Sequence, residues 1–233
     1  MPTQGRSRVA RAKSESQPLI EPPQLGRHLP VRVVSTLDDH VEYSSVTIAR
    51  ADLTGQTAHE VRFEEAHIRR SVLNRTRLHG VQVLDARFQA TDLSGAEWER
   101  ARFRRVEFIG CRLSGIMLLE ADLEDVKFID CNLEGAQFAS TKFRRARFDR
   151  CISRGVSFDH ADLAGVVFAG SDLTSSDFRE AVLQRADLRG SNLSRVQVRP
   201  KELRGAIIDR AQAVQVAILL GVIVAEEDER PSE

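Results

Sequence analysis

Apolar side chains recur along this chain at a constant interval of five residues. All eleven phenylalanines lie at positions whose number leaves a remainder of three on division by five, and Tyr43 and Trp98 share that phase. Stepping five residues at a time from Tyr43 to Ile208 gives 34 positions, of which 33 are apolar and only Ser153 is polar. This uninterrupted phase predicts one repeating architecture over most of the chain.

An interval of five fits neither an α-helix nor a flat strand. Five residues of helix advance by about 500°, so no apolar stripe forms. Five is an odd number, so in a strand successive members would point to opposite faces. The backbone must therefore bend once per repeat, and every glycine between residues 41 and 205 lies two places after one of these 34 positions, where a bend accepts it. The residue two places before each centre is mostly small, which predicts a narrow coil filled by one large and one small side chain per repeat.

A second spacing, of twenty residues, indicates that four repeats make one turn of the coil. The three cysteines of the chain are twenty residues apart and all occupy the small inward position. Side chains in this register should form columns inside the coil. The predicted columns include Cys111, Cys131 and Cys151; Leu113 and Leu133; and Phe88, Phe108, Phe128, Phe148 and Phe168. Because Ala, Ser and Thr take the same position elsewhere, we expect the thiols to fill space rather than to bind metal or form disulfides.

Polar positions add two predictions about the register. Ile152 stands where a polar residue is expected, beside Ser153, the one polar residue among the centres, and we therefore predict a local bulge at this pair, which a regular inward Ser153 would refute. Residues 102–105 are rich in arginine, residues 122–125 in acidic side chains, and residues 142–145 again in basic ones. Stacked coils would place these bands side by side in the order positive, negative, positive, which favours the same register.

Several quintets resemble the A(D/N)LXX consensus of the pentapeptide-repeat family. Examples are Ala-Asp-Leu-Thr-Gly at 51–55, Cys-Asn-Leu-Glu-Gly at 131–135 and Ala-Asp-Leu-Ala-Gly at 161–165. The resemblance covers about 165 of the 233 residues. It implies an all-β solenoid, a right-handed quadrilateral β-helix with four repeats per coil. The 34 repeats then give about eight coils, and we expect a short C-terminal helix after them.

The two ends of the chain depart from the five-residue period, and five of the seven prolines lie in the first forty residues. This change of composition predicts the division of the chain into segments. The predicted segments are 1–30, a disordered N-terminal arm; 31–45, an N-terminal cap strand; 46–205, the β-helix; 206–225, a C-terminal helical cap or dimerisation segment; and 226–233, an acidic tail.

The C-terminal segment is predicted to hold a short helix from Arg210 to Leu220 that ends at Gly221. Its aliphatic surface should be covered, either by the last coil or by a second copy of the chain. The residues that would serve either role are Ala211, Val214, Ala217, Ile218, Leu219 and Ile223. The segment also resembles that of the mycobacterial fluoroquinolone-resistance member of the family, and this resemblance implies a homodimer.

No pattern of catalytic residues stands out. The six histidines show no metal-ligand spacing, and no Ser-His-Asp arrangement, phosphate-binding loop or dinucleotide fingerprint is present. We therefore expect no enzyme activity, no cofactor, no metal and no small-molecule ligand. The basic residues near the start have no interleaved aromatics, so direct nucleic-acid binding is not expected. The apolar run at 216–225 is about half of a membrane span, no secretory signal is visible, and we expect a cytoplasmic protein.

Charge decides between two candidate functions. The family resemblance raises protection of DNA gyrase, a type II topoisomerase, from quinolone-type inhibitors by an acidic rod that imitates DNA. Duplex DNA carries one negative charge per ~1.7 Å, so a rod of roughly 40 Å would need about twenty. Residues 41–210 instead hold 27 Lys plus Arg against 25 Asp plus Glu. The sequence therefore favours a non-catalytic interaction or scaffold module that presents rigid flat faces to a protein partner, with gyrase binding as the alternative.

Three outward apolar residues are candidate contacts on such a face: Ile109, Ile129 and Leu119. Ile109 and Ile129 are twenty residues apart and should stack on the side of the phenylalanine column. A second interpretation is that these side chains only shield the corner beneath them.

Overall fold

The computed structural model describes residues 19–225, so the predictions for residues 1–18 and for the acidic tail at 226–233 lie outside the described residues. Its strands pair in parallel in two sheets, in the order β1-β2-β4-β6-β7-β8-β9-β10 and β3-β5. The strands and the helix are β1 (Val31–Arg32), β2 (Glu42–Ala49), β3 (Thr57–His59), β4 (Arg62–Arg69), β5 (Arg77–His79), β6 (Gln82–Gln89), β7 (Arg102–Ile109), β8 (Asp122–Ile129), β9 (Lys142–Asp149), β10 (Val167–Ala169) and α1 (Arg210–Leu219).

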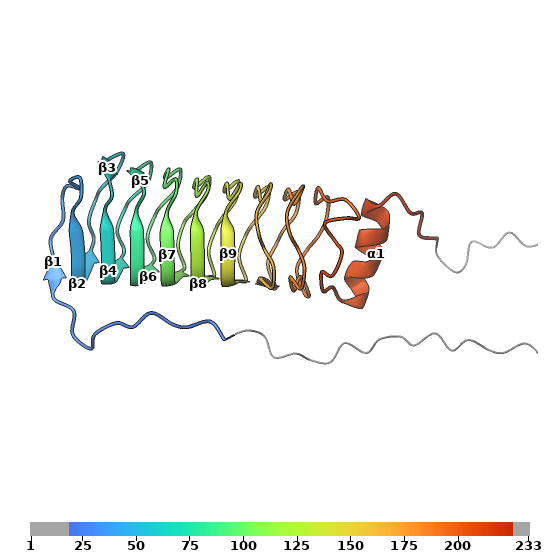
Figure 1. Cartoon of the computed structure of the whole chain (residues 1–233), viewed down its shortest axis with the longest axis horizontal. Helices are drawn as coiled ribbons and strands as arrows, with labels where there is room; N and C mark the ends of the chain where they lie inside the picture. Colours follow the sequence, from blue (N-terminus) through green and yellow to red (C-terminus); the bar gives the residue numbers. More distant parts are fainter. Residues whose placement is uncertain (1–18, 226–233) are drawn as a thin grey trace, which may run out of the picture.

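The chain winds into a β-solenoid whose coils stack along one axis, with β1 at one end and α1 at the other (Figure 1). Paired residues of neighbouring coils are twenty positions apart, as in the pairing of Asp122 with both Arg102 and Lys142. The predicted four repeats per turn are therefore confirmed. One ladder of bridges contains eight members, which are joined by seven steps of one turn: Asp52, Val72, Asp92, Arg112, Asn132, Ile152, Asp172 and Asn192.

The apolar centres fill the inside of the coil, as the five-residue period predicts. The phenylalanine column is buried, and successive rings from Phe88 to Phe168 are stacked with centroids 4.7 to 5.0 Å apart. Trp98 is also buried, and its indole nitrogen donates to the hydroxyl of Thr76 at 2.9 Å. Each buried Leu or Phe contributes roughly 1.5–3 kcal/mol before entropy is subtracted, so these columns are the main source of stability.

The corners of the coil require a left-handed backbone conformation, and glycine supplies only some of them. Among the described residues, 12 glycines and 22 other residues have positive φ, including Asp125 at 54° and Arg145 at 54°. A left-handed residue with a Cβ costs roughly 1–2 kcal/mol. The ladder hydrogen bonds and the buried columns on both sides of each corner offset this cost.

The predicted bulge at Ile152 and Ser153 is wrong. Ile152 takes a regular place in the ladder between Asn132 and Asp172, and its side chain points outward with 44% exposed. Ser153 points inward and is fully buried. The hydrogen bonds of the neighbouring coils fix the backbone position, so a small polar side chain at a centre changes the packing inside the coil and leaves the register intact.

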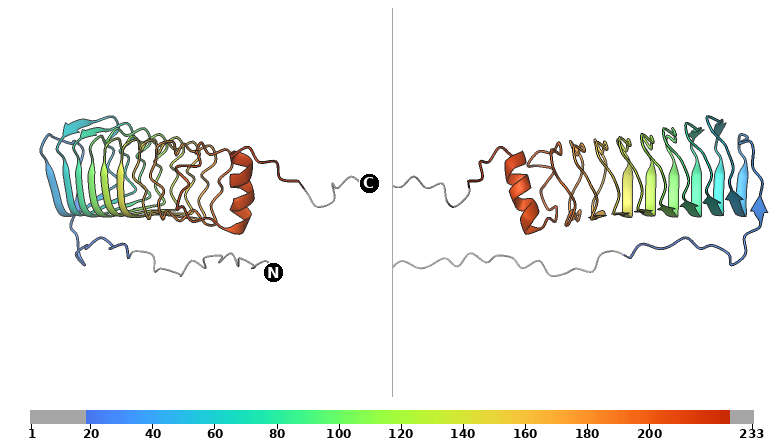
Figure 2. Two further views of the ribbon diagram at one scale, coloured as in Figure 1. Left: turned by 45° about the vertical axis from the view of Figure 1, so that its right-hand side comes forward. Right: turned by 180° about the vertical axis from the view of Figure 1, so that it is seen from behind.

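The ends differ from the regular coils. At the first end, β1 pairs in parallel with β2, where Val31 faces Thr47. At the other end, α1 lies across the last coil (Figure 1), and its ten residues are too few to span a membrane. Residues 19–30, within the range predicted to be disordered, lie extended beside the coils rather than free of them (Figures 1 and 2).

Candidate partner-binding face

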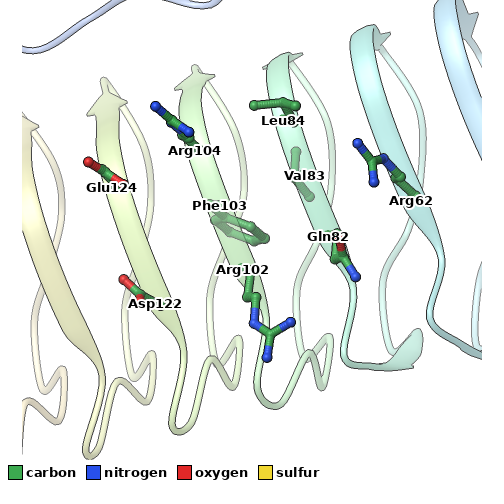
Figure 3. Close-up of a pocket in the computed structure, with 9 residues that line it drawn as sticks. All are labelled: Arg62, Gln82, Val83, Leu84, Arg102, Phe103, Arg104, Asp122 and Glu124. Atoms are coloured by element: carbon green, nitrogen blue, oxygen red, sulfur yellow. The ribbon is translucent and has the colours of Figure 1, made fainter.

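Strands β6, β7 and β8 present one flat row of outward side chains each. The register places Gln82 and Leu84 beside Arg102 and Arg104. On the other side of the two arginines, the same register places Asp122 and Glu124 of β8. Figure 3 shows these side chains projecting from adjacent strands of the same face. We call this surface, made of Gln82, Leu84, Arg102, Arg104, Asp122 and Glu124, the β6–β8 face.

A shallow hollow of about 230 Å³ lies on the β6–β8 face. Its floor is formed by the buried residues Val83 and Phe103, and Arg62 of β4 lines one side. Within the register, Leu84 stands between Glu64 of β4 and Arg104 of β7, and Gln82 stands between Arg62 and Arg102, so the outward residues of β6 are flanked by longer side chains. The face therefore combines apolar surface with cationic groups.

The predicted charge bands lie in register, but the ion pairs form on only one side of the acidic band. Arg144 lies 3.3 Å from Asp122, and Arg145 lies 2.5 Å from Glu124. Arg102 and Arg104 are exposed, and neither forms an ion pair within 4.0 Å with any residue of the described chain. The carboxylates next to them are already bound by the following coil, so these two guanidinium groups keep their hydrogen-bonding capacity.

The three apolar residues predicted as partner contacts divide between two sides of the rod. Ile109 and Ile129 are directly paired in the β7–β8 ladder, and both are half-buried. Leu119 is ten residues beyond Ile109, which is half of a twenty-residue turn, and so lies on the opposite side of the coil. The structure thus brings together Ile109 and Ile129 but not Leu119.

The residues predicted for the C-terminal cap or dimer interface also divide. Leu219 packs against the core at the end of the rod, and Ala217 is half-buried. Four others are exposed: Ala211, Val214, Ile218 and Ile223. Val214 and Ile218 are one helical turn apart and are 47% and 58% exposed. The helix therefore covers the last coil with one side and leaves apolar side chains on the other.

The cysteine column lies inside the coil, where Cys111, Cys131 and Cys151 are free and buried. Each thiol lies close to a backbone carbonyl oxygen, for example Cys111 Sγ at 3.3 Å from the oxygen of Phe88. A hydrogen bond with Cys131, together with burial, raises the pKa of Cys111, so its thiol stays protonated. Within residues 19–225, no three His, Cys, Asp or Glu side chains are grouped so that they could hold a metal ion.

Two family models match the coil. A pentapeptide repeat region matches residues 101–178, and a model of eight pentapeptide repeats matches residues 85–116. Together the two matches span residues 85–178, which begin within β6 and extend beyond β10. No curated protein matches the chain.

The solved structures that match include two pentapeptide repeat proteins at low identity. HetL, from the cyanobacterium Nostoc sp. strain PCC 7120 and described as involved in heterocyst differentiation regulation, is 22% identical, with a TM-score of 0.29, over 73% of this chain and 90% of its own. A trypsin-treated form of QnrB1, described as a plasmid-mediated fluoroquinolone resistance protein, is 20% identical, with a TM-score of 0.38, over 82% of this chain and 99% of its own.

Proposed function

The chain belongs to the pentapeptide-repeat family, and on this premise we propose that it is a non-catalytic interaction module that binds a protein partner through the β6–β8 face. The observation that carries the proposal is the pair of exposed arginines, Arg102 and Arg104, without an ion-pair partner in the described chain. Arginine beside apolar surface is typical of residues that contribute most to protein–protein affinity.

The chemistry of this face indicates what the partner should present. Each guanidinium group offers planar pairs of N–H donors that fit a carboxylate with two parallel hydrogen bonds. Leu84 and the hollow beside it would receive an apolar side chain. A partner segment with acidic residues beside an apolar one therefore fits the β6–β8 face.

The solenoid supports such binding because the face is rigid before the partner arrives. The β6, β7 and β8 strands are paired in register on both sides of the corner residue in each strand, and their outward side chains repeat at ~4.8 Å from coil to coil. Little backbone entropy is lost when a partner binds a surface that is already ordered. Ile109 and Ile129 extend the same strands around the bend and are proposed as secondary contacts.

Binding to DNA gyrase as a DNA mimic is the alternative that the sequence left open, and the arrangement of charges opposes it. Acidic side chains of the coils are bound by arginines of neighbouring coils, as in the pairs Arg150–Asp130 at 2.8 Å and Arg154–Asp172 at 2.5 Å. A surface that imitates DNA needs closely spaced unpaired negative charges. We therefore expect equimolar protein to leave gyrase supercoiling unchanged, with and without a quinolone. Protection of the enzyme would instead support the alternative.

The proposed face is tested by reversing its charge. The tagged full chain, the variant with Arg102→Glu and Arg104→Glu, and a control with Arg75→Glu and Arg195→Glu are used to capture proteins from the native cell. The control arginines are also exposed, without an ion-pair partner in the described chain, and at a corner away from this face. We expect a partner that is retained by the wild type and the control and lost from the first variant by at least tenfold. Equal capture by all three proteins would contradict the proposal.

A further inference from the structure

Residues 19–30 run along one corner of the solenoid, from β1 to the level of β9 (Figures 1 and 2). This corner is a column of residues spaced by twenty, which we call the corner column: Ser45, Glu65, Asp85, Arg105, Asp125, Arg145 and Gly165. The column contains side chains of both charges, and it lies beside the β6–β8 face without sharing a residue with it. The segment follows it without forming a strand.

Two carboxylates of the corner column hold the backbone of this segment. Asp125 accepts a hydrogen bond from the backbone N–H of Glu21 at 3.2 Å, and Asp85 accepts one from the backbone N–H of Gln24 at 2.8 Å. Both contacts use main-chain donors, so they do not depend on the side chains at positions 21 and 24. The Glu21 carboxylate adds a longer ion pair with Arg105 at 3.9 Å, so the segment is held by backbone spacing and by one side-chain charge.

The spacing of donors and acceptors matches. Asp85 and Asp125 are two turns of the coil apart, or about 9.6 Å at ~4.8 Å per turn. Glu21 and Gln24 are three residues apart, and three residues of extended or polyproline II chain span about 9–10 Å. The two residues between them are Pro22 and Pro23, which keep the chain extended and have no N–H to leave unsatisfied. In a donor-Pro-Pro-donor segment, the distance between the two backbone N–H donors thus matches the distance between two carboxylates that are two turns of the coil apart.

Arginines keep the two carboxylates in place. Arg145 binds Asp125 through two hydrogen bonds of 2.7 and 2.6 Å, and Arg105 binds Asp85 in the same way at 2.7 and 2.6 Å. Asp125 is 1% exposed and Asp85 8% exposed. Burial alone would raise the pKa of each carboxyl group, but the hydrogen bonds from its arginine and from the backbone N–H hold it below the ordinary value. Both groups are therefore ionised acceptors at neutral pH.

The segment fills the corner only partly. A hollow of about 250 Å³ remains between Leu19, Ile20 and the coil at Arg147 and Val167. The side chain of Leu19 is 85% exposed. At the other end, the backbone comes so close to Glu65 that a Cβ on Gly26 would lie 2.8 Å from its carboxylate. Backbone hydrogen bonds and the ion pair of Glu21 with Arg105, rather than buried side chains, hold the segment in this corner.

We propose that the corner column binds extended proline-containing segments. Residues 19–26 of the same chain occupy it, and a partner segment with the same donor-Pro-Pro-donor spacing binds there by displacing them. Residues 19–26 have an advantage over a free partner segment because they are covalently attached to the coil. An intramolecular ligand acts at an effective concentration in the millimolar range. A free peptide therefore binds well only when the own segment has been released.

The test uses the full chain with Pro22→Gly and Pro23→Gly, which loosens the own segment while leaving the corner column unchanged. Hydrogen exchange first measures the amide of Gln24, which we expect to be protected in the wild type and to exchange at least tenfold faster in the variant. A labelled peptide with the sequence of residues 19–27 is then titrated into both proteins. We expect the variant to bind it at least tenfold more tightly than the wild type.

A second peptide serves as the matched control, because it carries an N-methyl group on the amide that corresponds to Gln24. It lacks one donor and leaves the protein unaltered, and we expect its affinity for the variant to fall at least tenfold. Three outcomes would overturn the proposal: a Gln24 amide that is unprotected in the wild type or stays protected in the variant, a variant that binds no peptide at millimolar concentration, or equal binding of the two peptides.

Discussion

Two buried serines in neighbouring coils differ in how their hydroxyl groups are satisfied. The hydroxyl of Ser171 donates to the carbonyl oxygen of Phe148 at 3.1 Å and accepts from the backbone N–H of Cys151 at 3.1 Å. The hydroxyl of Ser153 has no hydrogen-bond partner among the described residues, although it is fully buried. A buried polar group without a partner costs about 1–3 kcal/mol. The two serines should therefore respond to the same substitution in opposite directions.

We expect Ser153→Ala to raise the free energy of unfolding by about 1 kcal/mol, because it removes an unsatisfied hydroxyl group. Ser171→Ala should lower it by about 1 kcal/mol, because it removes hydrogen bonds that are made. Denaturant unfolding of both variants and the wild type measures the two changes. A destabilised Ser153→Ala variant would mean that this hydroxyl group has a partner.

The twenty-residue spacing predicts which residues become neighbours, but not which neighbour each arginine binds. Arg105 has an aspartate one turn away on either side, Asp85 and Asp125, and it binds Asp85 at 2.6 Å. Asp125 is bound by Arg145 instead. A periodic sequence offers both choices equally, and side-chain geometry decides between them. The unpaired state of Arg102, on which the proposed function depends, could therefore not be predicted from the order of the charge bands.

At the scale of the element, a capping box with both of its hydrogen bonds stabilises the start of helix α1. Asp209 accepts from the backbone N–H of Gln212 at 2.9 Å, and the side chain of Gln212 accepts from the backbone N–H of Asp209 at 2.9 Å. The amide nitrogen of Gln212 then donates to the carbonyl oxygens of Leu188 and Ser191 at 2.6 and 2.7 Å. One buried glutamine thus joins the start of the helix to the last coil.

This arrangement predicts that the docking of α1 depends on pH. Backbone hydrogen bonds from Gln212 and Gly190 hold the pKa of Asp209 below its ordinary value of 3.8. The folded state therefore binds this proton more weakly than the unfolded state. The stabilisation of the docked helix by the Asp209 carboxylate is present above pH 3.8 and lost as the pH falls through the lowered pKa.

We expect Asp209→Ala to speed hydrogen exchange of the α1 amides by about fivefold at neutral pH. Exchange in α1 that is unaffected by this change would contradict the capping role.

The sequence predicted α1 well and the extended segment at 19–30 poorly, for a physical reason. The helix carries its own signals, a cap at Asp209 and a glycine at position 221 with φ of 83°. The segment at 19–30 has no apolar period, and its composition predicted disorder. Its order comes from single hydrogen bonds that join residues 104 and 61 positions apart, from Glu21 to Asp125 and from Gln24 to Asp85. A pattern in the local sequence cannot reveal contacts between residues so far apart in the chain.

At the scale of the whole molecule, the two ends of the rod differ in the surface they expose. The C-terminal end exposes apolar side chains in α1 and in the residues after it, which are Val214, Ile218, Leu220, Val222, Ile223 and Val224. Exposed apolar side chains at one end of a rod are covered when that end meets the same end of a second copy through two-fold symmetry. The homodimer stays a prediction from the sequence, with Leu219 in contact with the coil rather than with a second copy.

The dimer is tested with Val214→Lys and Ile218→Lys together. Charges on this exposed side should separate the copies without disturbing Leu219, so light scattering should show 26.1 kDa for the variant and twice this mass for the wild type at tens of micromolar. Ile152→Lys with Val182→Lys is the matched control, since these apolar residues are also exposed, at 44% and 47%, on the body of the rod. The control should remain dimeric. A wild-type protein with the mass of one chain would end this prediction.

The closed twenty-residue turn sets the rules by which such a chain can change its size. Copying one complete turn in tandem would add ~4.8 Å to the rod and return the chain to the same orientation, so both ends would keep their angular relation. Copying a single quintet would rotate everything beyond it by about a quarter of a circle and carry α1 to a different side relative to β1. Evolution and protein engineers thus have two independent adjustments on this scaffold, whole turns for reach and single quintets for angle.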